Sequence, residues 1–266
     1  MTLSPLASKP LSLYVHWPYC SFLCRFCAFS KARTPAQGVD HDRVTNALVR
    51  ELRTSLGPHK GRTVSSLYFG GGTPSLSRPG DIARIIEEAD RTTRLSPDAE
   101  ITLESNPTSA EVAKMREFRQ AGITRYSIGI QTLDDRSLAK MGRLHTGAEG
   151  LAAVDRAKAL FPGGVSFDMI FGFEGQTVEQ WRKELGTALG HADQHISIYQ
   201  LTVEPGTPLH RDRAAQRVRL PGGDTQAQLY EAAVELCSTH GFRHYEVSNY
   251  ARSAAAESKH NKSYWR

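Results

Sequence analysis

The stretch Tyr19-Cys20-Ser21-Phe22-Leu23-Cys24-Arg25-Phe26-Cys27 places three cysteines within eight residues, at the spacing C-x3-C-x2-C. Iron–sulfur clusters are normally held by four cysteine thiolates. Three thiolates leave one iron of a four-iron cube with an open coordination position, as a catalytic metal site keeps a position that a closed structural site lacks. The spacing therefore predicts an iron–sulfur cluster that is open to a ligand, with Cys20, Cys24 and Cys27 holding it.

Two other uses of these cysteines stay open at this stage. A disulfide would pair two of them, leave the third alone and need an oxidising compartment, while no signal peptide precedes the stretch. A zinc ion wants four ligands. The fourth cysteine, Cys237, is isolated among apolar residues and is interpreted as a buried small hydrophobe. His16 could serve instead, although it would lie inside a strand. The iron–sulfur interpretation is preferred.

Length and composition favour one soluble α/β domain. The chain has 266 residues, of which 39% are hydrophobic, and α/β barrels often reach this length as one domain. No apolar run approaches the roughly 18 residues that span a bilayer. The net charge is +5, but lysine and arginine are scattered rather than grouped in blocks. We expect no membrane span and no nucleic-acid partner, and the low cysteine content indicates a reducing compartment.

We expect three segments along the chain. Residues 1–10 form a short polar N-terminal extension without a recognisable targeting segment. Residues 11–250 form the core domain, and residues 251–266 begin a C-terminal segment that is truncated here. The compartment then depends on the source: we expect the cytoplasm for a bacterial protein and the mitochondrion for a eukaryotic one.

Strand-like and helix-like segments alternate along the core domain. The expected strands cover residues 11–17, 64–69, 100–105, 125–131, 165–172 and 195–203, with a possible seventh at 244–250. The expected helices cover residues 39–56, 81–91, 149–160 and 224–240, and capping boxes at 108–111 and 177–180 open two more. Repeated strand–helix units imply parallel strands with right-handed crossovers. About six units predict a partial or complete (β/α) barrel, and a doubly wound open sheet is the alternative.

Polar residues gather at the carboxyl ends of the expected strands, where barrels carry their chemistry. The cysteine stretch follows the first strand, and Gly70-Gly71-Gly72-Thr73-Pro74 follows the second. This glycine run lacks the patterns of phosphate loops and dinucleotide folds, and by itself it could be a tight turn. Glu104, Gln131 and Asp168 fall in or near the same places in later strands.

Together, the cysteine stretch and the glycine run resemble the radical S-adenosylmethionine superfamily. Further motifs narrow the resemblance to the oxygen-independent coproporphyrinogen III oxidase group and its heme-chaperone branch. These motifs are Tyr14-Val15-His16-Trp17-Pro18-Tyr19-Cys20, Phe69-Gly70-Gly71-Gly72-Thr73-Pro74-Ser75, Glu104-Ser105-Asn106-Pro107, Ser127-Ile128-Gly129-Ile130-Gln131, Gly142-Arg143-Leu144-His145 and Tyr199-Gln200-Leu201. The resemblance runs from about Tyr14 to the end of the chain.

The resemblance implies a [4Fe–4S] cluster whose unligated iron chelates S-adenosylmethionine, and an electron donor that reduces the cluster. Reductive cleavage of the sulfonium would give a 5′-deoxyadenosyl radical, a step that belongs to the cofactor while the protein orients it. Glu104 and Asp168 would accept from ribose hydroxyls or an ammonium, and Gln131 and Arg143 would lie near the methionine carboxylate. The implied cofactor-binding residues are Tyr14, Phe26, Gly71, Gly72, Thr73, Glu104, Gln131, Arg143 and Asp168.

Two features favour the heme-chaperone branch over the oxidases. In the oxidases a fourth cysteine stands two residues after the third, whereas this chain has Phe29 after Cys27. The run His260-Asn261-Lys262-Ser263-Tyr264-Trp265 is similar to the H-N-x-x-Y-W motif of the chaperone branch, whose histidine is the proposed heme ligand. Imidazole is a common ligand of heme iron. An aromatic cluster beside a helix is the other interpretation of this run.

Three functions follow from these features. The first is a heme chaperone that passes heme to acceptor hemoproteins and has no coproporphyrinogen oxidase activity. Its cluster and S-adenosylmethionine would then serve structure, regulation or formation of a homodimer. The second is an oxygen-independent coproporphyrinogen III oxidase, which would remove carbon dioxide from two propionates. The third is a metal-binding module without catalysis.

Overall fold

The computed structural model describes residues 9–265, apart from the side chains of residues 109 and 110. Residues 1–8 of the expected N-terminal extension, and residue 266, lie outside the described residues. Among the described residues, no helix has both the length and the apolar character needed to cross a membrane.

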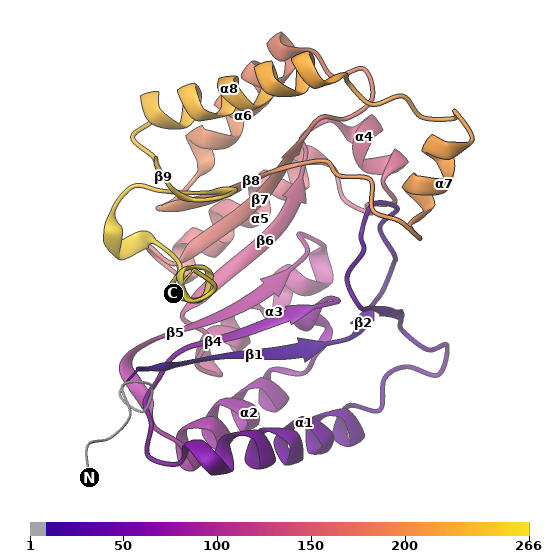
Figure 1. The fold of residues 1–266 in the computed structure, drawn as a ribbon. Helices are drawn as coiled ribbons and strands as arrows, with labels where there is room; N and C mark the ends of the chain where they lie inside the picture. The colour runs from indigo at the N-terminus through magenta and orange to yellow at the C-terminus, as the bar shows by residue number, and fades with distance from the viewer. Residues whose placement is uncertain (1–8, 266) are drawn as a thin grey trace.

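A curved sheet of eight strands organises the described part of the chain (Figure 1). Six strands run parallel and stand side by side in chain order: β1 (Leu11–Trp17), β4 (Val64–Gly71), β5 (Leu95–Ser105), β6 (Arg125–Gln131), β7 (Val165–Phe171) and β8 (His195–Gln200). Because neighbouring strands follow chain order, the predicted repeated parallel strand–helix units are confirmed, whereas a doubly wound sheet would reverse its order partway. Because β1 forms one edge and does not pair with the far edge, the barrel is partial.

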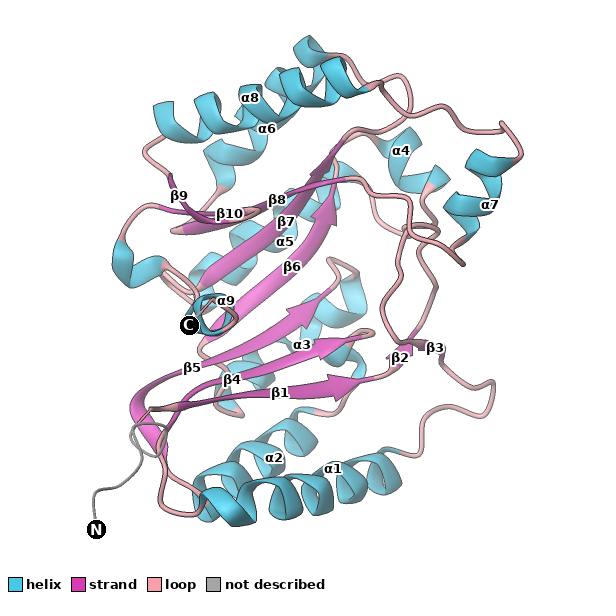
Figure 2. Cartoon of the chain, viewed as in Figure 1, coloured by secondary structure: helices cyan, strands magenta, loops and turns pink. Residues whose placement is uncertain are grey.

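Long helices cover the outer face of the sheet and leave its concave face open (Figure 2). They are α1 (His41–Leu56), α2 (Pro79–Thr92), α3 (Ser109–Gln120), α5 (Gly147–Leu160), α6 (Val178–His191) and α8 (Gly223–Thr239). Each turns an apolar stripe toward the strands, as α1 does with Val49, Leu52 and Leu56. The main core therefore lies between the sheet and these helices, and polar residues are left for the concave side.

Shorter elements complete the fold. They are β2 (Tyr19–Cys20), β3 (Ala32–Arg33), α4 (Asp135–Lys140), α7 (Pro208–Ala214) and α9 (Lys259–Ser263), with 3-10 turns at Gly57–His59, Pro74–Leu76 and Ala254–Ala256. The sequence analysis missed α4 and α7, because six or seven residues give too few turns for a readable apolar period.

Two expectations about local structure are wrong. Residues 244–250 form a hairpin and not one strand: β9 (Arg243–Glu246) and β10 (Asn249–Ala251) pair antiparallel, and Ser248, at φ 75°, lies in the turn between them. The capping box at 108–111 does not form, since Thr108 caps no backbone group with its side chain. Glu111 is only 2% exposed, so its side chain is buried rather than on the surface of the helix. The box at Thr177 and Gln180 is confirmed.

Candidate functional site

The cysteine loop is a long excursion between β1 and α1 that is held at both its stem and its tip. At the stem, β2 pairs with β3. At the tip, the backbone N–H of Arg25 donates to the carbonyl of Met141, just after α4, at 3.1 Å, and the N–H of Leu209 in α7 donates to the carbonyl of Arg25 at 3.0 Å. The two helices that the sequence analysis missed therefore support the loop that carries the cysteines (Figure 1).

The glycine run packs directly against the stem of this loop. The N–H of Gly72 donates to the carbonyl of Trp17 at 2.6 Å, and the N–H of Thr73 donates to the carbonyl of Tyr19 at 2.8 Å. A Cβ at Gly72 would lie 2.6 Å from the Tyr19 oxygen, and Gly71 adopts φ 110°. Only glycine allows this approach and this backbone conformation. The glycine run thus connects the end of β4 to the stem of the cysteine loop by backbone hydrogen bonds.

A cavity of about 130 Å³ lies where these two loops meet the ends of β5, β6 and β7. It brings together the three cysteines and eight of the nine residues predicted to bind the cofactor. They are Cys20, Cys24, Cys27, Phe26, Gly71, Gly72, Thr73, Glu104, Gln131, Arg143 and Asp168. The sequence analysis did not assign Phe22, Lys31, Asn106, Ser127 and Gly129, which line the same cavity. Asn106, Ser127 and Gly129 stood inside the quoted motifs, whereas Phe22 and Lys31 had no signal beyond their nearness to cysteine.

The cysteine side chains fit a cluster better than the alternatives. All four cysteines are free thiols, and Cys237 is fully buried in α8, as predicted. Within residues 9–265, no group of three histidine, cysteine or acidic side chains converges tightly enough to hold a single metal ion. A polynuclear cluster binds each thiolate through a different metal atom, so its ligands stand further apart around one cavity. Burial raises the pKa of Cys20, and this cost of holding a thiolate would be removed by bonding to iron.

Arg143 links the cysteine loop to the end of β6. Its Nη1 lies 3.5 Å from Sγ of Cys24, Nη2 donates to the carbonyl of Gly129, and Nε is buried without a partner. Gln131, the last residue of β6, has φ 77° and follows a register shift between β6 and β7. Such a left-handed conformation is uncommon for a residue with a side chain and is found at functional sites. These two residues border the cavity with unused hydrogen-bonding capacity.

Glu104 and Asp168 add two carboxyl groups to the lining of the cavity. Burial raises the pKa of Glu104 to about 7 and that of Asp168 to about 6. Glu104 accepts from the hydroxyl of Tyr68 at 2.7 Å and from the N–H of Gly71 at 3.3 Å. Neither carboxyl pairs with a lysine or arginine among the described residues. The cavity thus offers one guanidinium and two carboxyl acceptors, a pattern that suits a ligand with both anionic and donor groups.

Tyr14 and His260 lie outside this cavity and form an aromatic cluster with Tyr68. The ring of His260 stacks on Tyr68 with centroids 4.1 Å apart, and Tyr14 lies 6.0 Å from His260 and 5.9 Å from Tyr68. The sequence analysis predicted that Tyr14 binds the cofactor, but Tyr14 does not line this cavity. His260 is 6% exposed. The structure therefore has the aromatic cluster beside a helix that was the other interpretation of this motif.

Comparison with known proteins identifies the family. The sequence profile of the Radical SAM superfamily matches residues 14–187. The chain belongs to this superfamily. It is 43% identical to "Radical S-adenosyl methionine domain-containing protein 1, mitochondrial" of Mus musculus, over 97% of this chain and 58% of that protein. It is 36% identical to heme chaperone HemW of Mycobacterium tuberculosis (strain H37Rv), over 99% of this chain and 67% of that protein.

Among solved structures, coproporphyrinogen III oxidase (HemN) from Escherichia coli superposes with a TM-score of 0.79 at 25% identity, over 92% of this chain and 56% of that one. The chain thus spans less than two thirds of the length of the mitochondrial relatives and of this oxidase. Members of the radical SAM superfamily use a [4Fe–4S] cluster and S-adenosylmethionine, and the cavity described above has the side chains that such a pair requires.

We expect the raised pKa values of Glu104 and Asp168 to make the affinity of this radical SAM chain for S-adenosylmethionine dependent on pH. The ionised carboxylates of Glu104 and Asp168 accept stronger hydrogen bonds than the protonated groups do, and they take up protons as the pH falls through about 7 and about 6. For the cluster-loaded protein, we expect the dissociation constant to rise about tenfold between pH 8 and pH 6. Anaerobic titration at a series of pH values measures it.

The control for this prediction is Glu104→Gln, which removes the group that titrates near pH 7. It should bind more weakly at pH 8 and lose most of the pH dependence. Groups on S-adenosylmethionine titrate identically in both proteins, so the difference between the two curves isolates Glu104. Parallel curves for the two proteins would contradict the assignment.

Proposed function

We propose that this chain is a heme chaperone of the radical SAM superfamily, which binds heme and transfers it to acceptor hemoproteins. The observation that carries the proposal is its three-thiolate site with Phe29 at the position of the oxidases' fourth cysteine, in a chain that aligns over nearly its whole length with a heme chaperone. Its cluster would be held by Cys20, Cys24 and Cys27. Residues 11–250 would be its core domain, and residues 251–266 the beginning of a further segment.

In this proposal, the residues of the cavity hold S-adenosylmethionine against the cluster. Arg143 and Gln131 would bind its carboxylate, because a guanidinium suits a planar anion. Glu104 and Asp168 would accept from its hydroxyl or ammonium groups, and the backbone of Gly71, Gly72 and Thr73 would contact its methionine part. When bound, the cluster supplies an electron that is received from a donor protein. Cofactor binding would then support assembly of a homodimer or regulate heme release.

His260 is the proposed ligand of the heme iron. Burial lowers the pKa of His260 to about 4, so its imidazole is neutral at physiological pH, as iron ligation requires. Its Nδ1 is buried without a hydrogen-bond partner. Because the ring packs on Tyr68 on the concave side of the sheet, heme ligation needs α9 to move away from β4. Such a movement would break the hydrogen bonds that hold α9 against β5, including those from the Ser258 hydroxyl and the His260 N–H to Glu100 at 2.9 and 3.2 Å.

The proposed function predicts that His260→Ala weakens heme binding at least tenfold. Titration of the reduced and oxidised protein with hemin, followed by the Soret band, measures it. His240→Ala is the control, since His240 is exposed at the end of α8 and its side chain forms hydrogen bonds only with neighbouring residues of that helix. Thermal unfolding of both variants separates loss of ligation from loss of the fold. Equal heme affinity in the wild type and in His260→Ala would exclude His260 as the ligand.

The likeness to coproporphyrinogen III oxidase supports a second candidate, oxidative decarboxylation of a porphyrinogen. Anaerobic incubation with coproporphyrinogen III, S-adenosylmethionine and a reductant distinguishes the two. The chaperone proposal expects a Soret band with hemin and no vinyl-bearing product. A vinyl-bearing product without a stable heme complex would support the oxidase. If neither the heme complex nor the product formed, a metal-binding module without catalysis would be the remaining candidate.

The compartment we propose is the cytoplasm of a bacterium or the mitochondrion of a eukaryote, since relatives of both kinds exist.

A further inference from the structure

A second, larger cavity of about 580 Å³ occupies the concave side of the sheet beneath the first. The two share Phe26, Cys27, Glu104, Gln131 and Asp168, so they are continuous. Its volume is that of an ordinary small-molecule site. Within the larger cavity, the predicted cofactor-binding residues line only the end that the two cavities share, so its remainder has space for another ligand.

The walls of this larger cavity change character along its length. Near the shared end they carry aromatic and aliphatic side chains, among them Phe29, Tyr199, Ile170 and Leu201. Toward the amino ends of the strands they carry hydroxyl and amide groups and one guanidinium. This floor is lined by Arg125, Ser166, His195, Ser258 and Asn261. Such a cavity suits a ligand with a flat apolar body and an anionic end.

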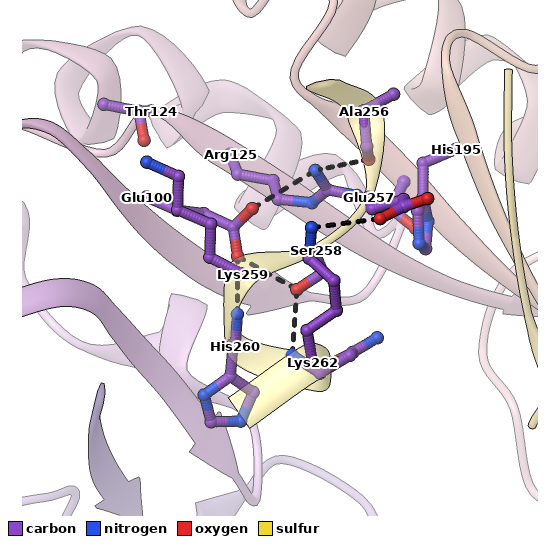
Figure 3. A network of polar contacts seen from close by, with 12 residues as sticks. Glu100, Thr124, Arg125, His195, Ala256, Glu257, Ser258, Lys259, His260 and Lys262 are labelled. Carbon is purple, nitrogen blue, oxygen red and sulfur yellow. Dashed lines mark hydrogen bonds and ion pairs between the residues drawn. The ribbon is translucent and has the colours of Figure 1, made fainter. Parts of the chain in front are cut away.

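Arg125, the first residue of β6, is the charged side chain of the floor. Glu100 contacts it but does not line the cavity. Arg125 is 7% exposed, and its Nη2 is buried without a hydrogen-bond partner. Its Nη1 donates to the carbonyl of Ala256 at 3.2 Å and to Oε2 of Glu100 at 3.4 Å (Figure 3). A buried guanidinium nitrogen without an acceptor is costly, so an anion that enters the floor would relieve that cost.

The carboxylate of Glu100 does not fully neutralise the positive charge of Arg125. Its Oε1 accepts from the hydroxyl of Ser258 at 2.9 Å and from the N–H of His260 at 3.2 Å (Figure 3). The contact of 3.4 Å to Arg125 is longer than the usual N–H···O distance near 2.9 Å. The carboxylate therefore divides its charge among three donors, and the positive charge of Arg125 stays available to a second anion.

The neighbours of Arg125 add hydrogen bonds without adding charge. Burial, together with the charge of Arg125, holds the pKa of His195 well below its usual value, so the imidazole is neutral. Its ring nitrogens share hydrogen bonds with Ser166, at 2.7 Å, and with the hydroxyl of Tyr245, at 2.8 Å. The acidic groups that line the cavity lie away from the floor: Glu104 and Asp168 line the end shared with the first cavity, and Glu204 follows the carboxyl end of β8. An anion at the floor would thus meet a cation, several hydroxyl groups and no competing negative charge except that of Glu100.

We propose that Arg125 receives a propionate carboxylate of a tetrapyrrole whose macrocycle lies against the aromatic walls of the larger cavity. This inference rests on the proposed function for the class of ligand, since both heme and coproporphyrinogen carry propionates. The guanidinium donates from Nη2 to the carboxylate, while its bonds from Nη1 to Ala256 and Glu100 keep the C-terminal segment in place. The same residue would therefore join ligand binding to the segment that carries His260.

Esterification of the ligand tests this proposal without altering the protein. The cluster-loaded chain is titrated with hemin and with hemin dimethyl ester, and in a second arm with coproporphyrin III and its tetramethyl ester. We expect the free acid to bind at least tenfold more tightly than its ester, because the neutral ester cannot form an ion pair with the guanidinium. The arm that shows this difference identifies which tetrapyrrole the floor accepts.

Variants of Arg125 connect the difference to this residue. Arg125→Gln should bind acid and ester with equal affinity, near that of the ester in the wild type, and Arg125→Lys should keep part of the difference. Arg50→Gln, on the exposed side of α1, is the matched control and should behave as the wild type. Equal affinity for acid and ester in the wild type would overturn the inference while heme binding stands. Absence of any tetrapyrrole binding would overturn both it and the proposed function.

Discussion

Cys24→Ala should lose the anaerobic iron–sulfur absorbance of the protein and all reductive cleavage of S-adenosylmethionine. The expectation follows from the geometry of the loop, in which Cys24 is one of three thiols on a single cavity and Sγ lies 3.5 Å from Nη1 of Arg143. With two thiolates left, no cysteine within the described residues can take its place, because Cys237 is buried in α8. Iron and sulfide counts on anaerobically reconstituted protein measure the effect.

Cys237→Ala is the matched control for this prediction. It removes a thiol of the same chemistry from the helical core, where it acts as a small hydrophobe, so we expect full iron content and a loss of about 1 kcal/mol in the free energy of unfolding. A four-iron cluster with normal cofactor binding in Cys24→Ala would contradict the assignment. Zinc in place of iron in the anaerobic wild type would contradict it as well.

The fold and the main site could be predicted from the sequence because both depend on short, local patterns. The apolar runs of β4, β6 and β7 are buried on both faces and read directly as parallel strands. Parallel order then brings every strand end to one edge, so Glu104, Gln131 and Asp168 had to meet the cysteine loop. The periodicity of the chain and the rule for parallel sheets were sufficient to predict that these residues meet, whereas their roles came from the family resemblance.

Other features depend on packing between distant segments, which a single sequence does not reveal. The sequence gives no sign that α4 and α7 hold the tip of the cysteine loop, since those contacts join Arg25 to Met141 and Leu209. The burial of Glu111 overrides a capping pattern that is locally sound. His260 was predicted as a ligand from its motif, yet its ring lies against Tyr68 because α9 folds back onto β4. The unpartnered nitrogen of Arg125 likewise emerges only in three dimensions.

Gly72→Ala should disable the site without changing any residue that binds iron. The new Cβ would lie 2.6 Å from the carbonyl oxygen of Tyr19 and 2.9 Å from backbone atoms of Pro18. Backbone atoms cannot rotate away as a flexible side chain can, so the stem of the cysteine loop must shift. We expect a loss of about 2 kcal/mol in the free energy of unfolding of the cluster-free protein. We also expect most of the iron content to be lost, because Cys20 belongs to that stem.

Gly186→Ala provides the control, since it makes the same chemical change where space is free. Gly186 lies in the middle of α6, and a Cβ there would meet nothing within 4 Å. Alanine is the better helix former, so this variant should gain about 0.5–1 kcal/mol and bind iron as the wild type does. Urea unfolding and iron counts on the two variants compare them directly. If Gly72→Ala took up a full complement of iron, the glycine run would be a simple turn, and the close contact between the two loops would not govern the geometry of the cluster site.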